Sequence, residues 1–284
     1  MTEPNQLSSS PTIGVFDSGF GGLTVLRALL ARLPQARFAF LGDTARLPYG
    51  SKSRRTIARY ASESAQFLVS QQSAQYMVIA CNTASALALD AIESAVPVPV
   101  LGVIEPGAAA ARSASQTGDV LVIATDATVQ SHAYAAACQA RGLRAIEKAC
   151  PLLVPLVEEG WTDHPVTAQV IRIYLDELLQ VAAAQGMNPD TLVLGCTHYP
   201  LLRPLIEKAV PAGMQVIDSA DAAADAAVHL FNLPLAGFAE EMGTAASKPE
   251  LRCFATDSVD KFERLGGRFL GRPVGPVQLV DLGG

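Results

Sequence analysis

Two cysteines at similar places in the chain are the residues best suited to chemistry. Cys81 follows the apolar run Tyr76–Ala80, and Cys196 follows the run that ends at Gly195. Each has a threonine within two residues, and each precedes a helical stretch, which Pro200 opens in the second case. Strand ends that precede helix N-termini are where open α/β sheets bind ligands. We therefore interpret the two cysteines as two halves of one site.

The predicted position should also affect thiol reactivity. Amide groups at a helix N-terminus favour the thiolate, so we expect Cys81 and Cys196 to have pKa values below the usual value of about 8.5. The alternative is that both are small buried apolar residues, as free cysteines commonly are. That interpretation is the one we give to the cysteines without such neighbours, Cys138, Cys150 and Cys253.

His198 and Asp17 are the polar groups that stand out beside these strand ends. His198 lies two residues after Cys196, where it could tune that thiol or donate to a ligand, although a buried structural histidine is the alternative. Asp17 follows the predicted strand Thr12–Phe16 and precedes Ser18 and a glycine-rich loop. It could cap the next helix. Capping alone would not explain a carboxylate at the ligand-binding edge of a sheet.

Short apolar strands and helices alternate along the chain. We predict strands at 12–16, 37–41, 76–80, 100–103, 120–124, 144–147, 215–217 and 251–255, besides the one that ends at Gly195. Predicted helices include 23–33, 53–71 and 166–185, one from the Cys81 turn to about 95 and one from a turn at Thr125–Thr128 to about 141. Such alternation is typical of parallel sheets covered on both faces.

The spacing of the strand ends predicts two lobes. The strand that ends at Asp17 precedes Cys81 by a distance similar to that between the strand ending near Thr125 and Cys196. We therefore expect an α/β fold of two doubly wound parallel-sheet lobes, related by pseudo-two-fold symmetry, with the active site in the cleft between them. The first lobe should comprise 12–104 plus 212–271 and the second 105–211, with 1–11 and 272–284 as tails.

Composition excludes several classes of protein. The chain has 284 residues and a net charge of −6, and the pair Arg54–Arg55 is its most basic stretch, so we expect no nucleic-acid partner. Five cysteines without a CxxC pair argue against a disulfide framework or a zinc ribbon. No apolar run approaches the roughly 20 residues of a membrane span, and the first 11 residues carry no signal-peptide pattern. These features predict a cytoplasmic protein without a membrane partner.

The sequence also predicts that no cofactor or metal is used. Gly19–Thr24 partly matches a dinucleotide loop, with Asp43 at the distance of a ribose contact, but the third glycine is missing and Asp17 would face the pyrophosphate. The two cysteines and His198 lack the paired spacing of a zinc site. Pyridoxal chemistry requires a lysine, and every lysine lies outside these motifs: Lys52, Lys148, Lys208, Lys248 and Lys261.

Five segments together closely resemble the glutamate racemases. They occur in the family's order between about Ile13 and Leu265: Asp17–Gly22, Pro48–Gly50, Cys81–Thr83, Val154–Glu158 and Gly195–His198. The resemblance implies a two-lobed fold and a cofactor-independent interconversion of L- and D-glutamate, which supplies D-glutamate for peptidoglycan. Homodimers are common in that family, so a homodimer is expected.

The same resemblance assigns roles to residues. Cys81 and Cys196 would be the acid–base thiols, assisted by Asp17 and His198, with Glu158 as a third assisting acid and its neighbour Glu159 as the alternative. The implied substrate contacts are Asp17, Ser18, Tyr49, Gly50, Asn82, Thr83, Thr197 and His198.

The residue types suit this reaction. Inversion at Cα requires removal of a proton from one face and delivery of a proton to the other, so two opposed groups are expected, and a thiol can serve as both acid and base. Two alternatives remain open: an aspartate racemase-like enzyme, which would use the same paired cysteines, and a non-catalytic amino-acid-binding module. The complete Asp17–Gly22 and Pro48–Gly50 motifs favour glutamate.

Overall fold

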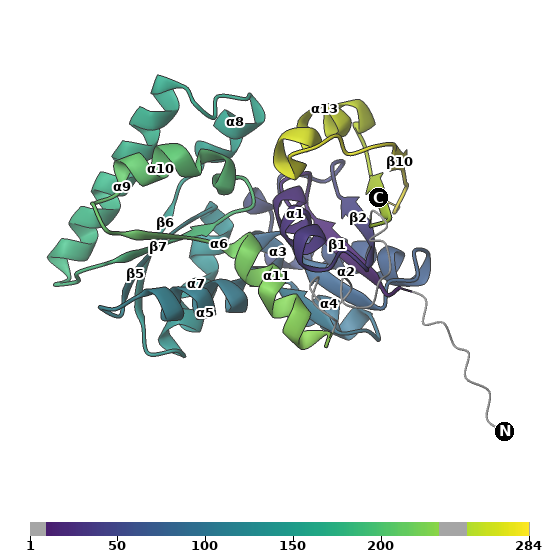
Figure 1. The fold of residues 1–284 in the computed structure, drawn as a ribbon, viewed down its shortest axis with the longest axis horizontal. Coiled ribbons are helices and arrows are strands. Elements are labelled where there is room, and N and C mark those ends of the chain that lie inside the picture. The colour runs from purple at the N-terminus through teal and green to yellow at the C-terminus, as the bar shows by residue number, and fades with distance from the viewer. Residues whose placement is uncertain (1–9, 233–248, 284) are drawn as a thin grey trace, which may run out of the picture.

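Two parallel sheets form the framework of the protein (Figure 1). The computed structural model describes residues 10–232 and 249–283. The first sheet has the order β10-β9-β2-β1-β3-β4. Its strands are β1 (Thr12–Asp17), β2 (Arg37–Gly42), β3 (Tyr76–Ile79), β4 (Val100–Gly102), β9 (Leu251–Ala255) and β10 (Val277–Leu279). The second sheet has the order β6-β5-β7-β8 and comprises β5 (Asp119–Ala124), β6 (Arg144–Ala149), β7 (Thr191–Gly195) and β8 (Gln215–Asp218).

The two sheets repeat one strand order, which confirms the predicted α/β fold of two lobes. The run β2-β1-β3-β4 corresponds to β6-β5-β7-β8, so β1 matches β5 and β3 matches β7. Phe16 pairs in register with Ile79, and Ala124 pairs with Gly195. Cys81 and Cys196 therefore leave equivalent strands at the carboxyl edge, beside the ends of β1 and β5.

Helices flank both sheets, close to where periodicity predicts them. Two predicted helices are each divided in two: α3 and α4 are separated at Ala88, and α6 and α7 at His132, whose φ of 55° lies in the left-handed region. The helices are α1 (Leu23–Arg32), α2 (Arg54–Ser70), α3 (Asn82–Leu87), α4 (Leu89–Ala95), α5 (Ile104–Ala114), α6 (Asp126–Ser131), α7 (Ala133–Gln139), α8 (Leu153–Glu158), α9 (Pro165–Ala184), α10 (Arg203–Ala209), α11 (Ser219–Leu230) and α13 (Val259–Leu270), with 3-10 turns η1 (Tyr49–Ser51) and η2 (Tyr199–Leu202).

The predicted lobe boundaries are wrong at two places. The segment 212–271 was expected to belong wholly to the first lobe, but β8 pairs in parallel with β7 of the second sheet. The segment 272–284 was expected to be a tail, but β10 pairs with β9 at the edge of the first sheet. The strand at 215–217 is predicted, but a short edge strand carries no sign of the sheet that it joins. Strand β10 has only 3 residues, too few to show a period. Residues 1–9 of the other predicted tail lie outside the described residues.

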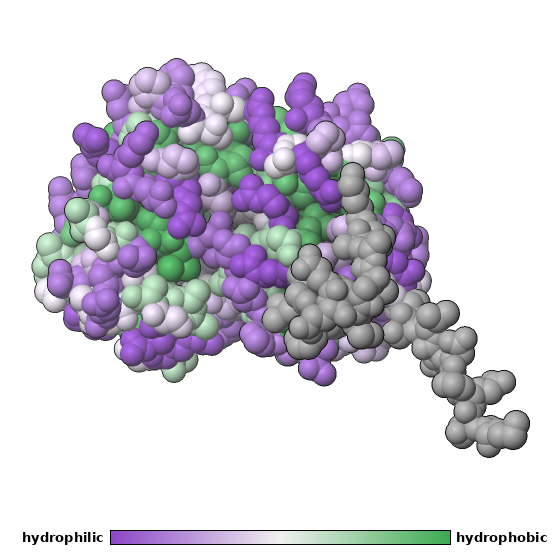
Figure 2. All heavy atoms as spheres, in the orientation of Figure 1, coloured by the Kyte–Doolittle hydropathy of each residue, from purple (hydrophilic) through white to green (hydrophobic). Residues whose placement is uncertain are grey.

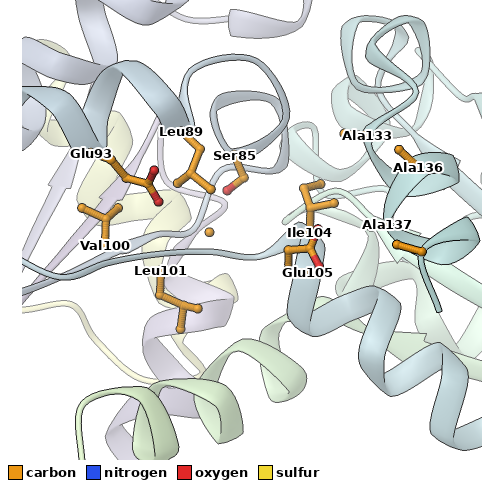
Figure 3. Close-up of a pocket in the computed structure, with 12 residues that line it drawn as sticks. Ser85, Leu89, Glu93, Val100, Leu101, Ile104, Glu105, Ala133, Ala136 and Ala137 are labelled. Carbon is orange, nitrogen blue, oxygen red and sulfur yellow. The ribbon is translucent and has the colours of Figure 1, made fainter.

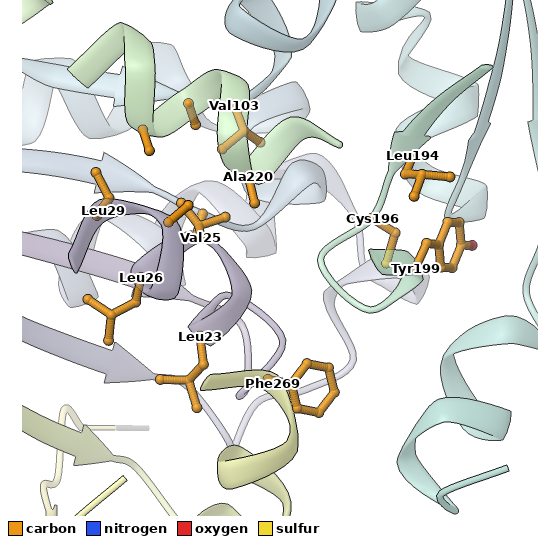
Figure 4. Packing of buried hydrophobic residues seen from close by; sticks show 14 of the residues in the cluster. Leu23, Val25, Leu26, Leu29, Val103, Leu194, Cys196, Tyr199, Ala220 and Phe269 are labelled. Atoms are coloured by element: carbon orange, nitrogen blue, oxygen red, sulfur yellow. The ribbon is translucent and has the colours of Figure 1, made fainter. Parts of the chain in front are cut away.

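The largest of three apolar clusters among the described residues extends through both lobes. It includes Val25 and Leu29 of α1, Val103 at the crossing between the lobes, and Leu194 of β7 (Figure 4). Helix α11 packs against α1 of the first lobe and α5 of the second, with Ala220 buried between them. Hydrophilic residues cover much of the outer face in Figure 2, and hydrophobic residues show in the recesses between them. Within the described residues, no helix is long and apolar enough to cross a membrane.

Candidate active site

The end of β1 and the turn after β3 hold the first half of the site. Asp17 is 1% exposed, and its Oδ2 accepts a hydrogen bond from the backbone N–H of Gly19 at 2.9 Å. Cys81 caps α3, where its Sγ accepts from the backbone N–H of Ala84 at 3.4 Å and lies 3.5 Å from Ser18 Oγ. The predicted trio of a carboxylate, a hydroxyl and a thiol is therefore brought together.

The turn after β7 holds the second half. Cys196 Sγ lies 4.0 Å from Nδ1 of His198, and Thr197 Oγ1 lies 3.4 Å from the same nitrogen. Contacts between the lobes fix this turn against the first half. Thr24 Oγ1 donates to the carbonyl of Thr197 at 3.2 Å, and a Cβ atom at Gly21 would lie only 2.3 Å from Thr197 Oγ1. Only glycine fits at position 21 without displacing the turn.

Two further side chains, Glu158 and Lys261, connect His198 to the edge of the site. Nε2 of His198 lies 3.5 Å from Oε1 of Glu158, an ion-pair distance without the alignment of a hydrogen bond. The other oxygen of Glu158 accepts from Nζ of Lys261 at 3.1 Å. Glu158, and not the exposed Glu159, is the carboxylate that contacts His198. Lys261 lies outside the sequence motifs, yet the fold brings it to the edge of the site.

The remaining predicted contacts lie where the lobes meet. Asn82 Oδ1 accepts from Tyr134 of the other lobe at 2.7 Å. Thr83 Oγ1 lies 3.0 Å from Thr125 Oγ1 and 3.3 Å from Thr128 Oγ1, and these three residues form a threonine cluster across the interface. Thr128 and Tyr134 were not predicted. The turn after the 120–124 strand, which corresponds to the end of β1, is the signal that could have indicated Thr125 and Thr128.

The loop that carries Tyr49 and Gly50 is held by Asp43. This buried carboxylate accepts from Tyr49 OH at 2.5 Å, from Arg46 Nε at 2.8 Å and from Thr256 Oγ1 at 2.9 Å. Asp43 is thus committed to the loop, which leaves no support for a ribose contact. Gly50 lies against Thr125, since a Cβ atom at Gly50 would be 3.4 Å from that side chain.

Burial raises the pKa values of Cys81, Cys196 and Asp17, contrary to the prediction for the thiols. Burial, and then the negative charge of Asp17, raises the pKa of Cys81 to about 11. Burial raises the pKa of Cys196 still further, although a backbone hydrogen bond from His198 opposes it. Asp17 also has a raised pKa because of its burial, which the charge of His198 partly offsets. Desolvation therefore outweighs the amides at the strand ends.

The pKa of Glu158 shifts in the opposite direction. Its burial alone would raise its pKa, but interactions with His198 and Lys261 more than compensate and lower it. The pKa values of the two carboxyl groups of the site are thus shifted in opposite directions, upward for Asp17 and downward for Glu158.

Three buried polar atoms of the site have no hydrogen-bond partner among the described residues: Asp17 Oδ1, Asn82 Nδ2 and His198 Nε2. Buried polar atoms are rarely left without a partner unless a bound molecule supplies one. A ligand with both donors and acceptors would satisfy Asp17 Oδ1 and Asn82 Nδ2, whereas His198 Nε2 faces Glu158. No group of three potential metal ligands occurs within residues 10–232 and 249–283.

A cavity of about 480 Å³ lies elsewhere, between the α3–α4 region, β4, α5 and α7 (Figure 3). Its lining is largely apolar, with the carboxylates of Glu93 and Glu105 at its sides. None of the predicted site residues lines it. The site proper is instead closed by the contacts between the lobes.

Two buried thiols at equivalent strand ends, each beside a different assisting group, are the arrangement expected of a racemase that moves protons at Cα. Residues 21–227 match the family described as Asp/Glu/Hydantoin racemase, and the chain belongs to that family.

Individual relatives are similar over nearly their whole length. The chain is 52% identical to a glutamate racemase of Koribacter versatilis, over 96% of this chain and 98% of the relative. The solved structure of a glutamate racemase isoform of Bacillus anthracis has a TM-score of 0.83 at 36% identity, covering 96% of this chain and 98% of the other. A glutamate racemase of Francisella tularensis, solved with D-glutamate, has a TM-score of 0.82 at 34% identity, covering 97% and 99%.

The raised thiol pKa predicts a pH-dependent stability. The folded protein raises the Cys81 pKa to about 11, against about 8.5 for an unperturbed thiol. Above the unperturbed value the unfolded chain releases this proton while the folded protein retains it, so the free energy of unfolding falls as the pH rises. Between about pH 8 and pH 10.5, this fall should be about 2 kcal/mol smaller in Cys81→Ser than in the parent protein. Urea titrations across that range measure it, and parallel pH profiles for the two proteins would contradict the assignment.

Proposed function

We propose that this protein is a cofactor-independent glutamate racemase that interconverts L- and D-glutamate by proton transfer between Cα and two cysteines. The observation that carries the proposal is the placement of Cys81 and Cys196 on equivalent strands of the two sheets, on opposite sides of one interface. The similarity to named glutamate racemases over nearly the full chain supports glutamate as the substrate.

In each direction of the reaction, one cysteine would act as a thiolate base and the other as a thiol acid. Cys196 takes the proton from L-glutamate while Cys81 delivers one to the other face, and the roles reverse for D-glutamate. Raised thiol pKa values suit the donor, which must hold its proton until the carbanion forms. The acceptor must ionise, and the ammonium group of bound glutamate would favour its thiolate. Asp17 and His198 are the neighbouring groups that can hold or return a proton beside Cys81 and Cys196, and Glu158 supports His198.

Substrate recognition would use the polar groups between the lobes. The unpartnered Nδ2 of Asn82 can donate to a carboxylate, as can the hydroxyls of Ser18, Thr83 and Thr197. Asp17 Oδ1 can accept from the substrate ammonium. Tyr49 OH is occupied by Asp43, so the contribution of the Tyr49–Gly50 segment would come from its backbone and its shape.

We place this activity in the synthesis of D-glutamate for peptidoglycan, in the cytoplasm and in a homodimer. All five cysteines are free thiols. The proposed chemistry requires both catalytic thiols to be reduced, which the cytoplasm favours. The peptidoglycan role and the homodimer rest on the family resemblance.

A circular-dichroism assay tests the activity directly. After dialysis against EDTA, and with no cofactor added, the protein should abolish the circular dichroism of L-glutamate as it approaches the racemic mixture. L-Aspartate should react much more slowly. A faster reaction with aspartate would favour the aspartate racemase alternative. Activity that returns only with a metal or cofactor would contradict the cofactor-independent mechanism, and glutamate binding without inversion would favour a non-catalytic module.

Serine at either catalytic position should stop the reaction. We expect Cys81→Ser and Cys196→Ser each to lower racemisation by at least about 10²–10⁴-fold, because a serine hydroxyl is a far weaker acid than a thiol. Cys253→Ser is the matched control, since Cys253 is also buried but lies in β9, outside the site. Near-normal turnover in either site variant, with the fold intact by circular dichroism, would show that the two-thiol mechanism is wrong.

The source of the new proton distinguishes two bases from one. In deuterium oxide, the thiol that donates exchanges its hydrogen with solvent before the substrate binds. The first D-glutamate formed from L-glutamate should therefore carry deuterium at Cα, while the remaining L-glutamate stays largely unlabelled. Early-time mass spectrometry of the separated enantiomers measures both. Substantial protium in the first product would indicate a single base that serves both faces.

A further inference from the structure

Lys261 makes a contact between the lobes that the proposed reaction has not used. It lies in α13, which packs against α1 of the first lobe, and its Nζ lies 3.1 Å from Oε2 of Glu158 in α8 of the second lobe. The Lys261 side chain is 41% exposed and that of Glu158 is 21% exposed. An ion pair this accessible contributes little to folding stability, because solvent screens it. Its position beside the site therefore calls for another explanation.

The contact continues inward to the thiol. The second oxygen of Glu158 faces His198 Nε2 at 3.5 Å, and His198 Nδ1 lies 4.0 Å from Cys196 Sγ. A carboxylate held on one side of an imidazole fixes the ring's orientation and favours a proton on the facing nitrogen. The nitrogen toward Cys196 is then left as the acceptor. A shift of Glu158 would thus change which proton the thiol can exchange.

Lys261 also contacts the aromatic wall that holds the imidazole. Its Nζ lies 5.5 Å from the ring centre of Phe20, whose ring is 6.1 Å from that of His198. Phe269, also in α13, contacts the His198 ring edge-on at 5.1 Å. The first lobe therefore encloses His198 through α13 and the glycine-rich loop, with Lys261 bridging both to Glu158.

Within residues 10–232 and 249–283, the first half of the site has no corresponding contact. Cys81 is accompanied by Asp17, whose second oxygen lacks a partner among the described residues, and by Ser18. The groups that support the two thiols therefore differ, although the strands that carry the thiols are equivalent.

We propose that Lys261 is a positioning residue for the Cys196 half-reaction, acting through Glu158 and His198. This inference rests on the proposed glutamate racemase activity. Lys261 does not touch the substrate. It holds Glu158 in place when the lobes are together, so that His198 is oriented toward Cys196 during the transfer between that thiol and Cα.

The test compares three single variants. Lys261→Met removes the charge and keeps the side-chain length, and it should lower kcat/KM by about 10-fold, because small misplacements of catalytic groups are costly. Lys261→Arg should restore much of that loss. Arg264→Met is the matched control, since it removes an exposed cation one turn further along α13 and should stay within about two-fold of the parent.

A direction-specific readout separates positioning from a structural role. The enantiomers have equal free energies, so kcat/KM is equal in both directions for every variant and cannot locate the defect. Kinetic isotope effects can show which half-reaction is impaired. In Lys261→Met, the deuterium isotope effect on kcat/KM should rise when the substrate is α-deuterated L-glutamate, because Cys196 removes that label. It should fall toward the equilibrium isotope effect with α-deuterated D-glutamate, because removal of that label by Cys81 is then no longer the slow step. A role in lobe closure or folding alone would move both effects in the same direction, and that result would overturn the proposal.

A double-mutant cycle with Glu158→Gln completes the test. If Lys261 acts through Glu158, adding Lys261→Met to Glu158→Gln should cause little further loss, whereas fully additive losses would contradict this route. Wild-type kcat/KM in Lys261→Met would also overturn the inference. Should that variant fail to fold, Lys261→Gln provides the same comparison. Absence of racemisation in the parent protein would refute the proposed function itself.

Discussion

Exclusion of water from two thiols is the physical constraint on which the site depends. Cys81 and Cys196 are each 5% exposed, and both have pKa values raised by burial. This burial follows from the repeated strand order, since the carboxyl edges of two similar sheets cover each other when the lobes meet. A thiol in this setting keeps its proton until a nearby charge favours its release. The contacts between the lobes therefore shield both thiols from water.

Contacts between the lobes keep water away from the two thiols. The shared apolar core and α11 join the lobes on one side, while the threonine cluster and the contact of Gly21 with Thr197 close the site itself. These contacts differ in kind. The core is broad and apolar, whereas those around the site are single hydroxyls and one close approach of backbone, which break and re-form more easily.

Much of the framework could be predicted from the sequence, because buried parallel strands are continuous apolar runs and a strand end marks a ligand position. Cys81 and Cys196 were found in this way. The pairing of β8 could not be, since a short edge strand carries no sign of which sheet it joins. The direction of the thiol pKa shifts was also missed, because local position reveals helix amides but not burial by another lobe. Lys261 and Tyr134 reach the site only through tertiary packing.

In the part of the chain that the structure describes, the segment that carries β9 and α13 has no counterpart in the second lobe, because the repeated order ends at β2 in one sheet and at β6 in the other. The pair of thiols belongs to the duplicated part of the fold, but Lys261 and Phe269 belong to this additional unit. The two lobes are therefore not equivalent, because the first lobe carries this additional unit. Substitutions in the last quarter of the chain can therefore change the surroundings of His198 while both strand-end motifs stay intact. One half of the site can thus vary in evolution independently of the two cysteines.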